Sequence, residues 1–326
     1  MALGDRYLHA VVFITGAWSD GNTTRSGLRG TGFVIGLPAA DPNAVFLYVV
    51  TAAHVVRPCH TTAVRITKQD GSVEDRPVKR WAYHASEDVA VTPFHDPTGQ
   101  FAHSFVETGQ FVGQATVERP PAPGDDVYFA GLLGMVPSMG AGNVPMLRAG
   151  AIGALGQIGI PMRLPDNTVI HVAGHLIDCR SFGGFSGSPC FVRYVSGTGT
   201  TPRIGLPYPV ESTLLLGMVA GHFDLKASVE LPDQEDRLKI PVAAGIAVLS
   251  TSETIMETLE EDEALVTERN NENENYRRRA IEEEGDAAAT ADLTVEDRGE
   301  FERFEDVLSK LAQVPKSELD EKLKES

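Results

Sequence analysis

The stretch GGFSGSP at residues 183–189 decides how the rest of this chain is interpreted. Ser186 stands there with glycines two residues before it and one residue after it, a pattern that neither helix nor strand propensity selects. Glycine lets the backbone turn sharply and lets a second segment approach closely. Such a turn can direct the N–H groups of Gly184 and Ser186 to one point beside Ser186 Oγ, the donor pair that an acyl-transfer oxyanion needs. Alone the pattern is weak, because most glycine–serine segments are simply turns.

Two segments upstream carry the groups that could activate this serine. Residues 48–56 read YVVTAAHVV, so that His54 follows an apolar strand, and residues 87–91 read EDVAV, so that Asp88 precedes another. A serine hydroxyl is a poor nucleophile until a base lies within hydrogen-bonding reach. An imidazole can act both as base and as acid near neutral pH, because its ordinary pKa is about 6.5. His54, Asp88 and Ser186 are therefore candidates for base, orienting carboxylate and nucleophile.

The segments TAAH at residues 51–54, DVAV at 88–91 and GFSGSP at 184–189 resemble, in this order, the three motif blocks of the trypsin-like serine proteases. The pattern is most similar to compact bacterial peptidases of the HtrA type, here without a PDZ module. The order His, Asp, Ser is that of the chymotrypsin fold, and other folds carry the triad in other orders. The resemblance extends from about residue 7 to about residue 260 and does not cover the chain beyond.

The resemblance implies a serine endopeptidase that hydrolyses peptide bonds through an acyl-enzyme. His54 would be general base and acid, Asp88 would hold its ring, Ser186 would be the nucleophile, and the N–H groups of Gly184 and Ser186 would form the oxyanion hole. A catalytically silent scaffold of the same fold, acting through its C-terminal tail, is the alternative. An esterase is a third possibility, since the same site could cleave esters.

The resemblance also indicates where substrate specificity would lie. Arg180, six residues before Ser186, would form the floor of the primary specificity pocket, and Ala220 and His222 would lie on the strand that lines the pocket and pairs with the substrate. A cation there would favour an acidic side chain before the scissile bond. Alternatively, Arg180 points outward or pairs with Asp178.

Phe185 departs from the pattern of the digestive proteases, which carry an aspartate at this place. That aspartate accepts a new N-terminal amine on activation, and a phenylalanine cannot form this ion pair. We therefore expect no zymogen activation of this kind. The oxyanion loop would have to be held by packing or by a partner.

Composition favours an all-β body, because apolar segments are short and the chain holds 32 glycines and 20 prolines. By the resemblance, we expect two six-stranded antiparallel β-barrels at about residues 1–115 and 116–250. A closing helix over residues 251–260 would complete a trypsin-like protease domain at residues 1–260.

The remaining residues differ sharply in composition. The formal net charge is −17, and residues 257–326 hold 23 acidic and 10 basic residues, so most of the charge lies at this end. High charge with low hydrophobicity predicts an acidic linker at 261–299, disordered or partly helical. Apolar residues at helical spacing predict a short helical tail at 300–326, which either packs within the protein or docks a protein partner. The body has no strongly basic character, so we expect no nucleic-acid binding.

The sequence predicts neither a cofactor nor a metal site. His171 and His175 are four residues apart on an extended segment, which separates them by about 13 Å. Without an export signal or a span-length apolar run, we expect a cytoplasmic protein that does not cross a membrane. Its three cysteines are then expected to be thiols.

Overall fold

The computed structural model divides the chain into two compact units, Met1–Asn270 and Asn271–Ser326. It describes residues 4–115, 119–131, 143–164, 168–179, 184–195, 211–230 and 237–282. Of the second unit, the described residues 271–282 are helical. The predicted tail helix at 300–326 lies outside the described residues. Within the part of the chain that the structure describes, no helix is long and apolar enough to cross a membrane.

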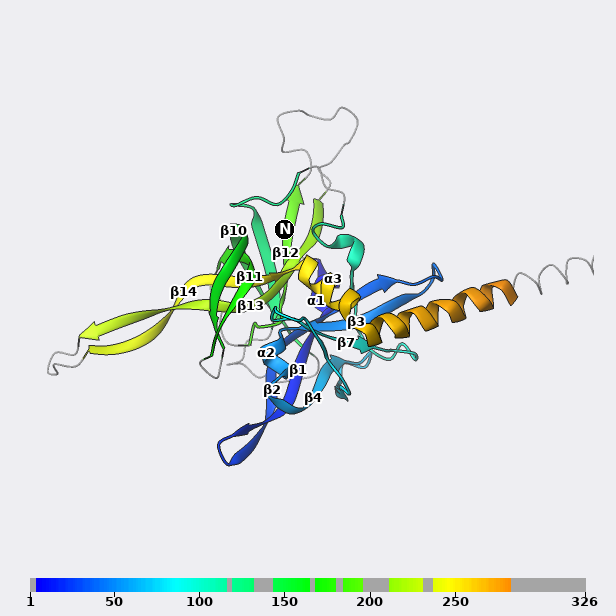
Figure 1. The fold of residues 1–326 in the computed structure, drawn as a ribbon, viewed down its shortest axis with the longest axis horizontal. Coiled ribbons are helices and arrows are strands. Elements are labelled where there is room, and N and C mark those ends of the chain that lie inside the picture. Colours follow the sequence, from blue (N-terminus) through cyan, green and yellow to red (C-terminus); the bar gives the residue numbers. More distant parts are fainter. Residues whose placement is uncertain are drawn as a thin grey trace, which may run out of the picture. The chain divides into compact units, whose positions relative to one another are not determined.

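The first half of the larger unit is a mainly antiparallel sheet of eight strands (Figure 1). The hydrogen-bonded order is β5-β4-β1-β2-β3-β7-β6, and β8 pairs with β2 in parallel. The strands are β1 (Val11–Asp20), β2 (Thr23–Pro38), β3 (Val45–Thr51), β4 (Cys59–Thr67), β5 (Val73–Pro77), β6 (Ala82–Tyr83), β7 (Ala90–Phe94) and β8 (Val106–Glu107). Short helices α1 (Asp5–His9), α2 (Ala53–Val56) and η1 (Thr108–Gln110) flank them.

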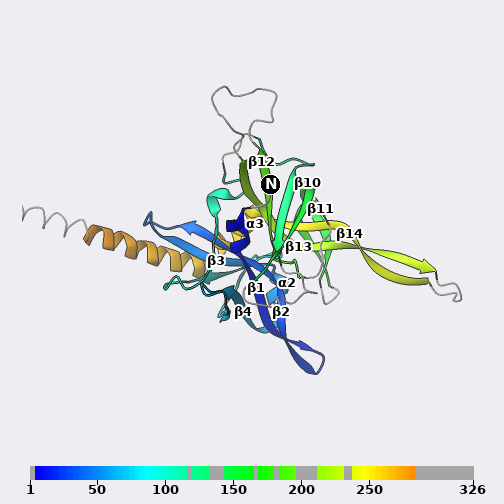
Figure 2. The same cartoon turned by 180° about the vertical axis from the view of Figure 1, so that it is seen from behind.

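The second half is a closed six-stranded barrel in the order β10-β11-β14-β13-β12-β9. All of its pairings are antiparallel. The strands are β9 (Asp126–Gly131), β10 (Met146–Arg163), β11 (Val169–Asp178), β12 (Pro189–Val195), β13 (Glu211–Glu230) and β14 (Arg237–Thr251). Seen from both sides, the blue and cyan N-terminal strands and the green and yellow barrel strands form two separate groups (Figures 1 and 2).

The expectation of a largely β body with a barrel in its second half is confirmed, but a six-stranded barrel in the first half is not. There the ladder runs from β5 to β6 without closing among the described residues. The strands at its margins are only two to five residues long. Such short strands form few hydrogen bonds with their neighbours, so their local sequence does not specify which strands they pair with.

The core of the N-terminal sheet continues into the barrel and the helix that follows it. β3 is buried from Tyr48 to Thr51, because β2 and β7 flank it. Phe111 is fully buried and forms a bridge to Leu215 of the barrel. Burying a side chain of this size stabilises the fold by about 1.5–3 kcal/mol. These contacts hold the two halves together.

The predicted closing helix is present as α3 (Ser252–Glu261). Thr251 caps it by accepting the Thr254 N–H on its side chain. Residues 263–282 are also helical, and Leu265 and Arg269 on this segment are buried. Arg269 donates to Tyr48 Oη at 3.2 Å and to the Leu259 carbonyl at 2.6 Å. The domain boundary at residue 260 stays a prediction, and the compact unit itself runs to Asn270.

Candidate active site

His54 and Asp88 lie together because the strands next to them are neighbours. β3 and β7 are antiparallel neighbours, with Thr51 opposite Ala90. The C-terminal end of β3 therefore lies beside the N-terminal end of β7. His54 Nδ1 lies 2.6 Å from Asp88 Oδ2. The backbone N–H of His54 donates to Asp88 Oδ1 at 2.9 Å. Both carboxylate oxygens are therefore engaged, which fixes the carboxylate plane.

The His54–Asp88 contact also favours one ring tautomer. The two side chains are 12% and 4% exposed, so the pair is largely removed from water. An ionised carboxylate can only accept, which makes Nδ1 the donor. In the tautomer that carries its proton on Nδ1, Nε2 is the nitrogen that can accept a proton. This is the arrangement that a general base requires.

Ser186 lies on the loop that enters β12, and two glycines give this loop its shape. Gly184 and Gly187 have φ angles of 100° and 89°, in the left-handed region that disfavours a side chain. A Cβ atom on Gly187 would lie only 1.9 Å from the carbonyl oxygen of Thr31. Gly187 therefore permits both the turn and the close approach of β2.

Thr31 of β2 holds this loop from the N-terminal sheet. Its N–H donates to the Ser186 carbonyl at 2.9 Å, and its hydroxyl donates to the Gly184 carbonyl at 2.8 Å. Thr51, three residues before His54, donates its hydroxyl to the Thr31 carbonyl at 2.6 Å. A short chain of hydrogen bonds thus connects the loop of Ser186 to the strand that leads to His54.

Packing holds the loop from the barrel side. Phe185 is fully buried and meets the Phe129 ring edge-on, with 5.5 Å between ring centroids. The guanidinium carbon of Arg148 lies 5.9 Å from the centre of the Phe185 ring. Phe185 therefore anchors this loop through apolar packing.

The two predicted oxyanion donors are available. Among the described residues, neither the Gly184 N–H nor the Ser186 N–H donates a hydrogen bond to another protein group. Both residues line the same cleft. Two backbone N–H groups that point to one site can stabilise a developing negative charge on oxygen.

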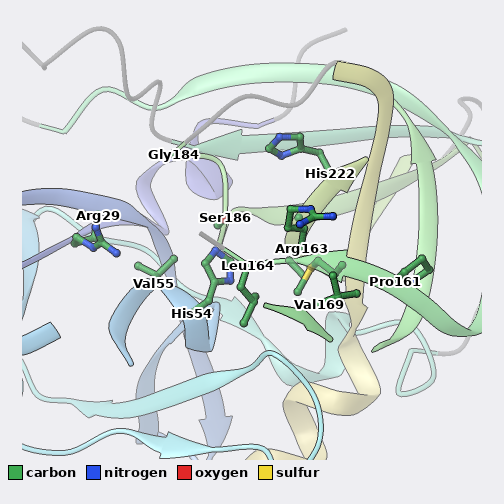
Figure 3. Close-up of a pocket in the computed structure, with 13 residues that line it drawn as sticks. Arg29, His54, Val55, Pro161, Arg163, Leu164, Val169, Gly184, Ser186 and His222 are labelled. Atoms are coloured by element: carbon green, nitrogen blue, oxygen red, sulfur yellow. The ribbon is translucent and has the colours of Figure 1, made fainter. Parts of the chain in front are cut away.

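The cleft has a volume of about 600 Å³ and joins residues of both halves (Figure 3). Of the predicted site residues, His54, Gly184, Ser186, Ala220 and His222 line it. Asp88 does not line the cleft but contacts His54 Nδ1. Arg180 lies outside the described residues. Figure 3 shows Ser186 and His54 among the residues that line this cleft. No hydrogen bond joins Ser186 Oγ to this ring in the described part of the chain.

Sequence reasoning missed most of the cleft wall. The other lining residues are Arg29, Val55, Pro161, Met162, Arg163, Leu164, Val169 and Gly221. Four of them lie at the paired ends of β10 and β11, and Leu164 directly follows β10. A residue at such a place has no local signature, since only the pairing of the strands brings it to the cleft. Arg29 is the exception, because it directly precedes the segment GTGF at residues 30–33.

Other reactive side chains lie outside this chemistry. Burial raises the pKa of the Cys179 thiol to about 11 and that of Cys190 well above its usual value, so both remain protonated. Both of these cysteines and Cys59 are free. Burial lowers the pKa of His175, whose Nδ1 accepts the Gly156 N–H at 3.1 Å. Among the described residues, no group of three or more His, Cys, Asp or Glu side chains could hold a metal ion.

Several solved structures are similar to this chain at low identity. The apo MamO protease domain from Magnetospirillum magneticum is 18% identical, with 77% of this chain and 96% of that chain covered and a TM-score of 0.39. The active form of the Rv3671c protease from M. tuberculosis is 19% identical, with coverages of 78% and 81% and a TM-score of 0.41. The HtrA-type protease AlgW, in a structure with a decapeptide, is 14% identical, with coverages of 79% and 65% and a TM-score of 0.43.

Comparison with curated proteins gives no significant match. The family model described as "Trypsin-like peptidase domain" matches residues 30–195, about half of the chain. The matched segment contains His54, Asp88 and Ser186 together with the loop and strands that carry them.

Proposed function

Because the chain belongs to the trypsin-like peptidase family, as its motif blocks predicted, we propose that it is a serine endopeptidase with His54, Asp88 and Ser186 as its catalytic residues. Membership of this family implies protein or peptide substrates. The observation that carries the proposal is the double hydrogen bond of His54 to Asp88, at the wall of a cleft that Ser186 also lines.

The proposed reaction begins with the attack of Ser186 on the substrate. As Ser186 Oγ attacks the substrate carbonyl, His54 Nε2 takes the hydroxyl proton. The resulting imidazolium is stabilised by Asp88, which is already bonded to Nδ1 and has little water around it. The carbonyl oxygen becomes an oxyanion, and the N–H groups of Gly184 and Ser186 would bind it. One such donor typically contributes about 3 kcal/mol to transition-state stabilisation.

The second half of the reaction returns the site to its starting state. His54 gives its proton to the leaving amine, and the acyl group stays on Ser186. Water then attacks the ester, with His54 again as the base. Hydrogen bonds between nucleophile and base often tighten only when substrate occupies the site. We therefore expect substrate to bring Ser186 Oγ into hydrogen bonding with His54.

A fluorophosphonate probe tests the proposal, since it reacts with a serine only when the serine is activated. The probe should label the full-length protein at Ser186 and should not label the Ser186→Ala variant. Ser188→Ala is a matched control, because the buried hydroxyl of Ser188 has no hydrogen-bond partner among the described residues. The probe should still label this variant. Loss of peptide cleavage in Ser186→Ala alone completes the test. A folded wild-type protein that neither reacts with the probe nor cleaves peptides would favour the silent scaffold.

A further inference from the structure

Resting on the proposed peptidase function, we infer that the preferred substrate is a peptide with acidic side chains on both sides of the cleaved bond. Arg29 and Arg163 are the residues that select it. Neither belongs to the triad or to the oxyanion loop. Figure 3 shows them on either side of His54 and Ser186, Arg29 toward the N-terminal sheet and Arg163 toward the barrel.

The cleft wall differs in charge from the protein as a whole. Its described lining contains two arginines, Arg29 and Arg163, and no aspartate or glutamate. The whole chain, in contrast, carries a formal net charge of −17. Asp88, the nearby carboxylate, is already engaged by His54. A peptide entering the cleft therefore meets cations that are not neutralised by the wall itself.

Arg163 is exposed and forms no ion pair with a described acidic side chain. It is the last residue of β10, opposite Val169 across the hairpin. The preceding residue, Met162, is buried in one cluster with Ala220 of the cleft wall. Its sulfur is so close to Gly221 that a Cβ there would lie 2.6 Å away. This packing fixes the end of the strand, and Arg163 with it, beside the strand expected to pair with substrate.

Arg29 is held in a different way, and its charge is also left without an anionic partner among the described residues. Its guanidinium carbon lies 4.3 Å from the centre of the Trp18 ring, a cation–π contact. Its Nε is buried and has no hydrogen-bond partner among the described residues. The next residue, Gly30, lies so close to the Ser186 carbonyl that a Cβ on it would be 3.0 Å away.

The stacking on Trp18 orients the Arg29 guanidinium without neutralising it, and a guanidinium presents paired donors that match a carboxylate. An acidic side chain reaching Arg29 would therefore meet a partner that is already ordered. The same side chain reaching Arg163 would pair in water, with a smaller gain. This difference in burial predicts two unequal contributions to substrate preference.

The test uses internally quenched peptides in which one glutamate at a time, before or after the cleaved bond, is replaced by glutamine. For wild type, glutamate near Arg163 should raise kcat/KM about fivefold, the upper range for an exposed ion pair. Glutamate near Arg29 should raise it about tenfold, as for a hydrogen bond to a charged group. Both preferences should shrink in 0.5 M salt, because ions screen exposed pairs.

Variants assign the preference to the two arginines. Arg163→Gln should remove only the preference for glutamate near residue 163, and Arg29→Gln should remove only the preference for glutamate near residue 29. Arg163→Glu should replace the first preference by a preference for lysine at the same substrate position. Arg29→Lys, which keeps the charge beside Trp18, should retain part of the preference near residue 29. Arg76→Gln removes the same charge on β5, away from the cleft, and should leave the preference unchanged. Equal rates for the glutamate and glutamine peptides in wild type, with Ser186 still labelled by the probe, would overturn the inference and leave the proposed function intact.

Binding decides the inference if the protein proves inactive. In the Ser186→Ala variant, fluorescence anisotropy should show a labelled glutamate peptide binding at least about fivefold more tightly than its glutamine version. The double variant with Arg29→Gln and Arg163→Gln should lose this difference. Equal Kd values for the two peptides in the Ser186→Ala protein would reject the acidic-substrate inference independently of any catalysis.

Discussion

Replacing Thr31 by valine tests whether the N-terminal sheet positions the proposed nucleophile, Ser186. Thr31 is fully buried, and its hydroxyl donates to the Gly184 carbonyl at 2.8 Å. Valine has nearly the same shape, so it removes the hydrogen bond without leaving a cavity. A buried acceptor that loses its donor costs about 1–3 kcal/mol, which the loop can recover only by moving. A shift of the Gly184 peptide would misplace the oxyanion donors relative to the substrate.

We expect this misplacement to appear in kcat rather than in KM. If about 1.4 kcal/mol of transition-state stabilisation is lost, kcat falls roughly tenfold. KM should change by less than about twofold, because Thr31 does not line the cleft. The assay is steady-state cleavage of a quenched peptide together with the rate of fluorophosphonate labelling at Ser186. Both rates should fall together.

Thr31→Ser separates positioning from stability. It keeps the hydroxyl and deletes a buried methyl group, so it should lower the free energy of unfolding by about 1 kcal/mol while kcat stays near wild type. A Thr31→Val protein that is labelled and turns over at the wild-type rate would refute the positioning argument. So would a Thr31→Ser protein as slow as Thr31→Val.

Three further outcomes follow from the described contacts. Asp88→Asn should keep the fold but lower kcat by about 10⁴-fold, because an amide favours the wrong ring tautomer of His54. Peptide-cleavage assays measure kcat, and an unchanged Tm shows that the variant is folded. Hydrogen bonds from Arg119 hold the pKa of Asp125 below its usual value, so the carboxylate stabilises the fold above pH 4, and this contribution is lost as the pH falls below it. The Tm difference between wild type and Asp125→Asn should accordingly be clear at pH 6 and small at pH 2, and a constant difference would contradict it. Arg269→Ala should lower the free energy of unfolding by about 1–3 kcal/mol in urea titrations, since two buried hydrogen bonds disappear, whereas the exposed Arg279→Ala should not.

Residues within continuous motifs could be picked out from the sequence, and residues that depend on strand pairing could not. His54 and Asp88 stand at the ends of apolar runs, and the structure pairs those runs as β3 and β7. Arg163 reaches the cleft only through the β10–β11 hairpin, whose pairing shifts register three times along its length. The local sequence does not predict such shifts in register, because each depends on bulges and on the neighbouring strands. The expected barrel in the first half, which is not confirmed among the described residues, depends likewise on pairings between strands distant in the sequence.

The proposed nucleophile and the proposed base belong to different halves of the unit, so their distance depends on the contacts between the halves. Ser186 is carried by the barrel and His54 by the sheet. Three hydrogen bonds through Thr31 tie the Ser186 loop to β2 and β3, and Glu87, next to Asp88, accepts the Ala173 N–H of β11 at 3.0 Å. A displacement of one half against the other would change the separation of Ser186 Oγ and His54 Nε2 before it changed either local motif. Activity should therefore respond to substitutions at this junction even when the triad residues are untouched, and local sequence motifs alone cannot report whether the site is assembled.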